Sequence, residues 1–277
     1  LLRNSTMPPL STLLGQPSRV LSSPTPIVGL SHAPGSDSFL VTQQSLGVSI
    51  HSASTLKCLR SWLVPSSVTL THAATLVPAA SRLICVREHH TVFSWREKDD
   101  EIDLLCAARL SLPALTLLHA DALHDAIVVV QIDGSALFLR AELQPPSPSD
   151  GAASTALRRA EDLALAVSPA PKGDEIAVWA ALLQLPAGAE APLALLTLMR
   201  SGGGVRLVSH TLTPFAASKG EHAPLQLRSV ALSDLSPSAF LTSSARLAGS
   251  ELCGASIVPA GRTLAATGTA AAAAAAA

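Results

Sequence analysis

One short stretch of the sequence contains side chains that could bind a metal ion. Its four polar residues are His119, Asp121, His124 and Asp125. Imidazole nitrogens and carboxylate oxygens are ligands that zinc accepts, but the spacing matches no established arrangement such as H-E-x-x-H. Asp and His side chains also form polar turns by hydrogen-bonding the local backbone. We interpret the cluster as a turn between strands, and we predict neither a metal ion nor a cofactor.

The other motifs do not predict catalysis. Gly202-Gly203-Gly204 lacks the Lys-Ser/Thr that follows the last glycine of a phosphate-binding loop, so a hairpin turn explains it better. No G-x-S-x-G occurs, and no Ser, His and carboxylate residues follow one another in an order typical of hydrolases. His89-His90 lies between two apolar runs, where we expect exposed imidazoles at a hairpin tip. We therefore predict that the chain is not an enzyme and has no small-molecule substrate.

The cysteines indicate neither a zinc site nor a redox dithiol. Cys58, Cys85, Cys106 and Cys253 are far apart, and no C-x-x-C pair is present. Cys85 lies inside an apolar run, where a thiol behaves as a small hydrophobic group. We expect reduced, buried cysteines and an intracellular protein, since the residues after Leu1-Leu2-Arg3 do not form the apolar core of a secretion signal.

Composition argues against two classes of partner. Among 277 residues, 19 are Lys or Arg and 20 are Asp or Glu, so the net charge is −1. No segment therefore has the basic surface that duplex nucleic acid or an anionic membrane requires. The apolar runs between residues 176 and 199 are interrupted by Gln184, Pro186, Glu190 and Pro192, and none reaches the roughly 20 residues of a spanning helix. We predict no membrane contact and mainly protein partners.

Pairs of short apolar runs repeat along the chain and would position these residues. Leu83 to Val86 and Val92 to Trp95 are rich in β-branched and aromatic residues and flank Glu88-His89-His90, a pattern typical of a β-hairpin. Equivalent hairpins begin at Phe39, Ile127 and Leu195, and a weaker copy begins at Phe240. The hairpins at Phe39, Leu83 and Ile127 start about 44 residues apart, the spacing of four-stranded propeller blades. The sequence predicts an all-β fold, a WD40-like β-propeller of degenerate repeats.

Further strands would complete these blades. Inner strands are expected at Val68–Ala73 and Leu115–His119, and outer strands at Leu56–Trp62 and Leu104–Leu110. Asp133-Gly134 predicts a type I′ turn, because both residues tolerate positive φ.

The propeller is expected to span residues 27–262, with other segments around and within it. Residues 1–26 are rich in Ser, Pro and Leu and predict an N-terminal arm. A long insertion at about 144–174 delays the fourth hairpin, and a short helix at Ala152–Ala160 would expose Arg158 and Arg159. Residues 263–277 form a low-complexity tail, in which Ala270 to Ala277 is either true sequence or unassigned residues.

The succession of motifs from residue 39 to residue 143 resembles a known family. Its parts are Ser61-Trp62, Thr69-Leu70-Thr71, Arg82 to Val86 and Val92 to Trp95. It is similar to a degenerate WD-type propeller, without regular Gly-His and Trp-Asp dipeptides. Within that class it most resembles the amino-terminal propeller of the nucleolar UTP-A (t-UTP) family, which includes nucleolar protein eleven and its fungal counterpart.

The resemblance implies a non-catalytic scaffold of the small-subunit processome in the nucleolus, supporting pre-rRNA transcription and processing in ribosome biogenesis. It implies as partners other propeller and helical-repeat proteins of a large complex, with local contacts to pre-ribosomal RNA. Exposed arginines such as Arg158 and Arg159 would make those contacts. Three alternatives stay open. One is a scaffold of another large assembly, such as a vesicle coat, ciliary complex or nuclear pore, with the cytoplasm as the alternative location. The others are a propeller-fold hydrolase and a β-rich fold that is not a propeller.

Overall fold

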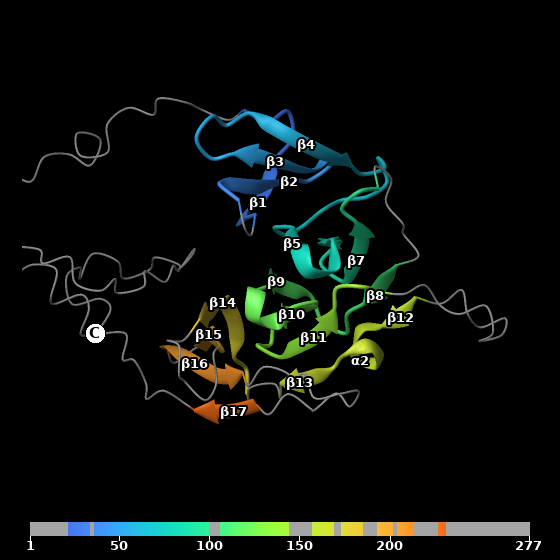
Figure 1. Cartoon of the computed structure of the whole chain (residues 1–277). Coiled ribbons are helices and arrows are strands. Elements are labelled where there is room, and N and C mark those ends of the chain that lie inside the picture. Colours follow the sequence, from blue (N-terminus) through green and yellow to red (C-terminus); the bar gives the residue numbers. More distant parts are fainter. Residues whose placement is uncertain are drawn as a thin grey trace, which may run out of the picture.

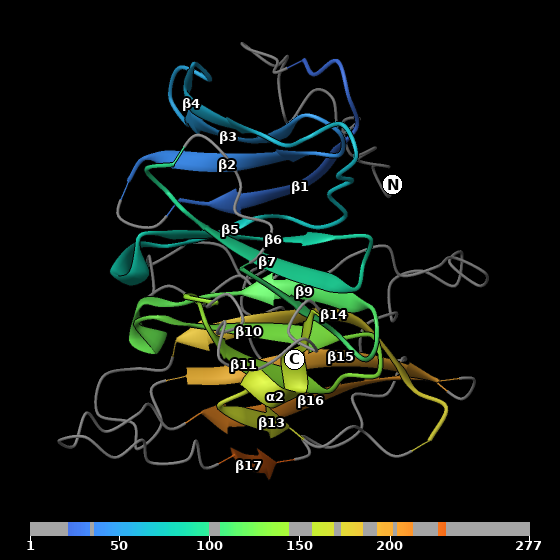
Figure 2. The ribbon, with the colours of Figure 1, turned by 90° about the vertical axis from the view of Figure 1, so that its right-hand side faces the viewer.

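The computed structural model describes residues 22–33, 36–99, 106–143, 157–168, 173–184, 193–201, 204–212 and 227–230. In these ranges the chain forms four sheets, which follow one another along an open arc in Figure 1. Figure 2 shows the same sheets stacked, with their strands running across the stack. The predicted all-β, propeller-like architecture is confirmed, and the four described sheets do not close into a ring.

Sheet one consists of four antiparallel strands in chain order. They are β1 (Ile27–His32), β2 (Ser38–Gln43), β3 (Gly47–Ser52) and β4 (Cys58–Leu63). The hairpin predicted to begin at Phe39 is confirmed, with Phe39 opposite His51 and Gln43 opposite Gly47. Gly47 has φ +134°, and a Cβ atom there would lie 2.0 Å from the carbonyl oxygen of Trp62, so this turn requires glycine.

Sheet two contains the hairpin predicted around Glu88-His89-His90. Its strands are β5 (Thr75–Val77), β6 (Arg82–Arg87), β7 (Thr91–Arg96), β8 (Ala107–Arg109) and β12 (Arg158–Arg159), and the turn η1 (Pro78–Ala80) joins β5 to β6. The inner strand predicted at Val68–Ala73 is wrong: only Leu70 forms an isolated bridge there, to Arg87. Thr71 hydrogen-bonds His72 and Val86 through its hydroxyl group, and side-chain bonds of this kind to the backbone compete with a strand ladder.

Sheet three contains the hairpin predicted at Ile127. Its strands are β9 (Ala114–Leu118), β10 (Ala126–Gln131), β11 (Ala136–Arg140) and β13 (Ala166–Ser168), and the turn η2 (Asp121–Leu123) joins β9 to β10. The predicted type I′ turn is wrong, because Gly134 has φ +82° whereas Asp133 does not have positive φ. The Gly134 amide donates to the carbonyl of Gln131 at 2.9 Å. This is a type I turn followed by a left-handed glycine.

Sheet four contains the hairpin predicted at Leu195. Its strands are β14 (Ile176–Gln184), β15 (Leu193–Ser201), β16 (Gly204–Leu212) and β17 (Leu227–Val230). The weaker copy at Phe240, residues 1–21 of the arm and the tail from 263 to 277 lie outside the described residues.

The segment predicted as an insertion contributes strands to two sheets. β12 pairs in parallel with β8 of sheet two, and β13 pairs with β11 of sheet three. A helical turn, α2 (Ala160–Leu163), lies between them. The expectation that Arg158 and Arg159 lie on a helix is wrong, because their backbone pairs with Ala108 and Arg109. Residues 152–156 of that predicted helix lie outside the described residues.

The core consists of three apolar layers, each between successive sheets. Between sheets one and two lie Leu40, Val48, Trp62, Leu83, Phe93 and Trp95. Between sheets two and three lie Ile84, Val86, Val92, Ile127 and Val129. Between sheets three and four lie Val128, Phe138, Leu193 and Leu195. Because alternate residues of a strand point to opposite faces, sheets two and three are buried on both faces, and this accounts for their continuous apolar runs.

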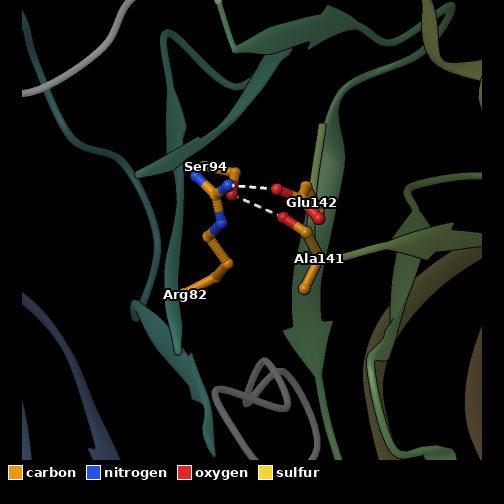
Figure 3. A network of polar contacts seen from close by, with 4 residues as sticks. All are labelled: Arg82, Ser94, Ala141 and Glu142. Atoms are coloured by element: carbon orange, nitrogen blue, oxygen red, sulfur yellow. Dashed lines mark hydrogen bonds and ion pairs between the residues drawn. The ribbon is translucent and has the colours of Figure 1, made fainter. Parts of the chain in front are cut away.

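Two polar contacts also join sheets two and three (Figure 3). The buried guanidinium group of Arg82 donates to Glu142 Oε1 at 2.5 Å, and the Ser94 hydroxyl donates to the carbonyl of Ala141 at 2.5 Å. Arg82 and Ser94 lie on β6 and β7, and their partners directly follow β11. The contacts satisfy polar groups that would otherwise be buried without partners.

Candidate functional site

Loops of neighbouring sheets are joined by backbone hydrogen bonds along one side of the stack, from sheet one to sheet four. The carbonyl of Gln44, in the β2–β3 hairpin, accepts from the Leu70 amide at 2.8 Å. In the same linker between sheets one and two, the carbonyl of Thr69 accepts from the Glu88 amide of the β6–β7 hairpin at 3.2 Å. Sheets one and two are therefore joined where their central hairpins turn.

The same pattern continues to sheets three and four. The carbonyl of His89 accepts from the Ala114 amide at 2.7 Å, and the carbonyl of Pro113 accepts from the Ile132 amide at 3.0 Å. The carbonyl of Ile132 then accepts from Ala177, on β14, at 2.7 Å. We call the loops joined in this way, residues 44–46, 64–74, 88–90, 110–114 and 132–135, the hairpin rim.

The central turn of the hairpin rim has an unusual backbone conformation. Glu88 and His89 have φ values of 51° and 61°, a left-handed conformation that residues with a Cβ seldom adopt. The His89 amide donates to Thr71 Oγ1 at 3.1 Å, so the linker from sheet one holds this turn in place. The surroundings therefore impose the conformation, and such positions often belong to functional surfaces.

Two histidines meet beside this turn. The rings of His72 and His89 lie edge to face, with centroids 5.2 Å apart. Burial of His72, and then the nearby imidazole of His89, lower the pKa of His72 to about 4, although a hydrogen bond with the backbone of Ala114 acts in the opposite direction. His72 is therefore neutral at physiological pH, and its side chain adds no charge to this part of the rim.

Exposed apolar side chains lie in or directly beside the rim loops of different sheets. Leu46 and Leu112 are each 36% exposed, Ile132 is 37% exposed, and Ile176, at the start of β14, is 42% exposed. These residues were not predicted from the sequence as part of a site. A usable signal was present, because each directly adjoins a hairpin turn or an interstrand loop, where an apolar side chain has no sheet face to cover.

The arginines predicted from the sequence lie at the outer edge of sheet two. Arg159 is exposed and lies opposite Arg109, which is also exposed, across the parallel β12–β8 pair. Arg158 is half-buried. Although burial opposes the change, hydrogen bonds from Ser111 and the charge of Arg159 hold the pKa of Glu161 below its usual value. The structure thus adds Arg109 to the predicted basic pair, with an acidic neighbour close by.

The His and Asp cluster between β9 and β10 forms a turn, as interpreted from the sequence. His119 Nδ1 hydrogen-bonds the carbonyl of Ala126 at 2.9 Å, and Asp125 accepts from the guanidinium group of Arg140. Asp121 begins the short turn η2. In the part of the chain that the structure describes, no three His, Cys, Asp or Glu side chains are grouped so that they could hold a metal ion.

The cysteines only partly follow the prediction. Cys85 and Cys106 are buried, and burial raises the pKa of the Cys85 thiol, so this side chain is an unreactive part of the core. Cys58 is exposed on β4, so the expectation that it is buried is wrong, because it lies on the outermost strand of its sheet. Cys253 lies outside the described residues.

A search for helices that could cross a membrane, confined to the described residues, finds none of sufficient length and apolar character.

No family model matches the sequence, and no curated protein matches it. Among solved structures, the chain is similar to the β-propeller domain of Cps50 (Swd1) from Myceliophteria thermophila, with 12% identity, a TM-score of 0.43, and coverage of 76% of this chain and 73% of that domain. The Neurospora crassa Pan2 WD40 domain is 9% identical, with a TM-score of 0.41 and coverage of 72% of this chain and 50% of that chain. BBS1N, solved in complex with ARL6DN, is 12% identical, with a TM-score of 0.45 and coverage of 77% of this chain and 65% of that chain.

The chain spans half of the Pan2 structure and about two thirds of the BBS1N structure. At these identities and TM-scores the likeness transfers neither a family nor a function. The fold class follows from the strands themselves: successive antiparallel sheets of four principal strands that pack face to face define an all-β, WD40-like β-propeller architecture.

Proposed function

We propose that the chain is a β-propeller scaffold that binds other proteins through the hairpin rim. The observation that carries this proposal is the run of backbone hydrogen bonds, which holds loops of sheets one to three and the start of β14 in fixed relative positions. A rigid surface loses little conformational entropy on binding. The exposed side chains of Leu112, Ile132 and Ile176 supply the apolar contacts that the centre of a protein interface requires. This role needs no cofactor and no small-molecule substrate.

The proposal can be tested by purifying the tagged full-length protein from its own cells and quantifying the proteins that accompany it. Leu112→Glu and Ile132→Glu place a charge on the rim, and each should reduce the recovery of direct partners at least about tenfold, because about 1.4 kcal/mol of lost contact energy has that effect. Val167→Glu is the matched control, because Val167 is 50% exposed on β13, outside the rim. Equal recovery with all three variants would refute docking through the rim.

We further propose that the assembly is the small-subunit processome and that the protein acts in the nucleolus. The support is the resemblance of residues 39–143 to the UTP-A family. Purification followed by mass spectrometry and RNA sequencing should recover other UTP-A proteins together with the 5′ external transcribed spacer. Recovery of coat, ciliary or nuclear pore components without that RNA would replace the processome with another assembly. A fluorescently tagged protein that stays in the cytoplasm would contradict the nucleolar location.

A local RNA contact would involve the arginines at the outer edge of sheet two. Arg109 and Arg159 lie side by side there, and guanidinium groups contact phosphates without reading sequence. Replacing Arg158 and Arg159 by alanine should lower crosslinking to pre-ribosomal RNA several-fold. A control that replaces Arg96 and Lys98, both exposed near the end of β7, removes the same charge elsewhere. Unchanged crosslinking in the first variant, or equal loss in both, would refute the contact.

A further inference from the structure

A serine and a histidine are hydrogen-bonded on the face of sheet one that does not pack against sheet two. Ser49 Oγ and His51 Nε2 are 2.9 Å apart, and these residues are only 6% and 7% exposed. They are two positions apart on β3, so their side chains point to the same face of the sheet. The pair was not predicted from the sequence, because a serine and a histidine two positions apart match no hydrolase motif.

The second nitrogen of this imidazole determines which atom carries the proton. His51 Nδ1 lies 3.0 Å from the carbonyl oxygen of Leu56, and a carbonyl can only accept a hydrogen bond. In the neutral ring, Nδ1 must therefore carry the hydrogen, and Nε2 is left with a lone pair facing the Ser49 hydroxyl. This is the tautomer in which a histidine can take a proton from serine, with a carbonyl in the place where hydrolases usually have a carboxylate.

The carbonyl that orients His51 is held by an uncommon backbone conformation. Leu56 has φ 57°, in the left-handed region that residues with a Cβ seldom adopt. Its amide donates to the carbonyl of Ser52 at 2.8 Å, which fixes the turn before β4. The ring of Phe39 stacks on the imidazole ring of His51, with ring centroids 5.7 Å apart. The imidazole is thus held by a carbonyl, a hydroxyl group and an aromatic ring, the kind of support that a reactive group requires.

The pair lines a pocket of about 250 Å³. Ser61 on β4 lies directly opposite Ser49, is exposed, and lines the same pocket. Residues opposite each other in adjacent strands bring their Cβ atoms to roughly 5 Å, so the Ser61 hydroxyl can donate to an oxygen of a group bound at Ser49. The pocket is smaller than those that usually hold drug-sized ligands, so it suits a small acyl group.

We propose that Ser49 and His51 form a nucleophile and base pair that cleaves esters of small acyl groups. This inference goes beyond the scaffold role, and neither depends on the other. Ser49 Oγ forms a bond to the ester carbonyl carbon while its proton passes to His51 Nε2. The bond from that carbon to the alcohol oxygen then breaks, and the alcohol leaves with the proton from His51.

Water completes the reaction by the same route. It gives a proton to His51 Nε2 as its oxygen bonds to the acyl carbon, and the bond to Ser49 Oγ breaks. Ser49 recovers its proton from His51, and the carboxylic acid leaves. No oxidation and no cofactor are involved, and the side chains of Ser49 and His51 return to their starting state.

The test uses the full-length protein and a biotinylated fluorophosphonate, which reacts with activated serines and releases fluoride. Peptide mass spectrometry should locate the adduct on Ser49 of the unaltered chain. Ser49→Ala should abolish labelling at this site, and His51→Gln should slow it at least about a hundredfold and remove its pH dependence, because general base catalysis contributes about that much or more. Release of p-nitrophenol from p-nitrophenyl acetate should fall in parallel.

Matched controls lie within the same segment. Ser52 and Ser54 share an exposed hydroxyl pair at 3.1 Å, and Ser54→Ala should leave labelling of Ser49 unchanged. Absence of an adduct on Ser49 in the folded protein, or equal labelling of Ser52 and Ser54, would overturn the proposal. An unchanged rate in His51→Gln would do the same. Because the adduct is mapped on the unaltered chain, the test does not depend on the variants folding.

Discussion

Sheets one and two are built from similar hairpins but differ in what covers them. In sheet two, residues 82–86 of β6 and 91–95 of β7 are all buried, because apolar layers pack on both faces. Sheet one packs on sheet two through Leu40, Val48 and Trp62. Its other face carries Ile27 and Leu30 of β1, which are 41% and 62% exposed. The central hairpin of sheet one is still largely buried, and the exposed apolar side chains of this sheet lie on its outer strands β1 and β4.

The difference shows that an apolar side chain is buried only where another part of the protein packs on it, since Ile27 and Leu30 stay exposed. The free energy lost on truncating a side chain depends on the apolar area and packing that it loses, so the two sheets should respond to mutation very differently. Four predictions test how strongly burial determines the effect of a substitution, from the largest expected effect to the smallest.

Truncation in the layer between the two sheets should have the largest effect. Phe93 is completely buried and stacks on Trp95, with ring centroids 5.2 Å apart. Phe93→Ala should lower the free energy of unfolding by about 3–5 kcal/mol, because it removes a large apolar group and leaves a cavity. Urea denaturation followed by circular dichroism measures this. A loss below about 1 kcal/mol would show that this layer is not the packed core described here.

Two ion pairs among the described residues, one buried and one exposed, should differ in how much free energy of unfolding is lost when one partner is removed. Glu142→Ala leaves the Arg82 guanidinium group, whose side chain is 9% exposed, without its partner. The expected loss is about 2–3 kcal/mol, since an unpaired buried charge is strongly unfavourable. Asp125→Ala removes the partner of Arg140 from a pair whose side chains are 43% and 40% exposed, and the loss should stay below about 1 kcal/mol. Equal losses in urea denaturation would contradict the contrast.

His72, in the linker between sheets one and two, should make stability depend on pH. Its pKa is lowered to about 4 in the folded protein from 6.5, so between these values the unfolded chain binds the proton more readily. The contribution of neutral His72 to the free energy of unfolding is fully present above pH 6.5 and is lost as the pH falls towards 4. Urea denaturation should show that the free energy of unfolding decreases less between pH 7 and pH 4.5 for His72→Gln than for the unaltered protein. Identical decreases would contradict the assignment.

Substitution at an exposed position on the outer face of sheet one should have the smallest effect. Leu30→Ser changes a side chain that is 62% exposed, so the free energy of unfolding should change by no more than about 0.5 kcal/mol. Urea denaturation followed by circular dichroism measures this change as well. A loss comparable to that of Phe93→Ala would mean that another part of the protein covers this face in solution.

The hairpins could be predicted from the sequence because their signals are local. Val92 to Trp95 and Ile127 to Val130 combine β-branched or aromatic residues with polar turns, and the structure places β7 and β10 there. Their regular spacing also indicated blades of a propeller. Most of the polar turns were placed correctly for the same reason, including the one that contains His119 and Asp121.

The rest depends on contacts between distant residues. β12 has only two residues, and its hydrogen bonds come from β8, about 50 residues earlier, so no local pattern marks it as a strand. The rim was missed because its hydrogen bonds join loops of different sheets, such as Pro113 to Ile132. The pair of Ser49 and His51 was missed because the carbonyl that orients the imidazole belongs to Leu56, whose backbone conformation is not evident from its residue type.

The strands contributed by residues 158–168 set an order in which the protein can be completed during synthesis. Sheet one needs no residue beyond Leu63, so all four of its strands exist as soon as that residue has left the ribosome. β8 gains its outer neighbour β12 only when Arg159 has been synthesised, and sheet three is complete only when Ser168 has been synthesised. At about 5–20 residues per second, sheet two is without its last strand for roughly 3–10 s after β8 has been made. During that interval the exposed edge of β8 is open to other chains, so this is the period in which a nascent chain would most benefit from a chaperone.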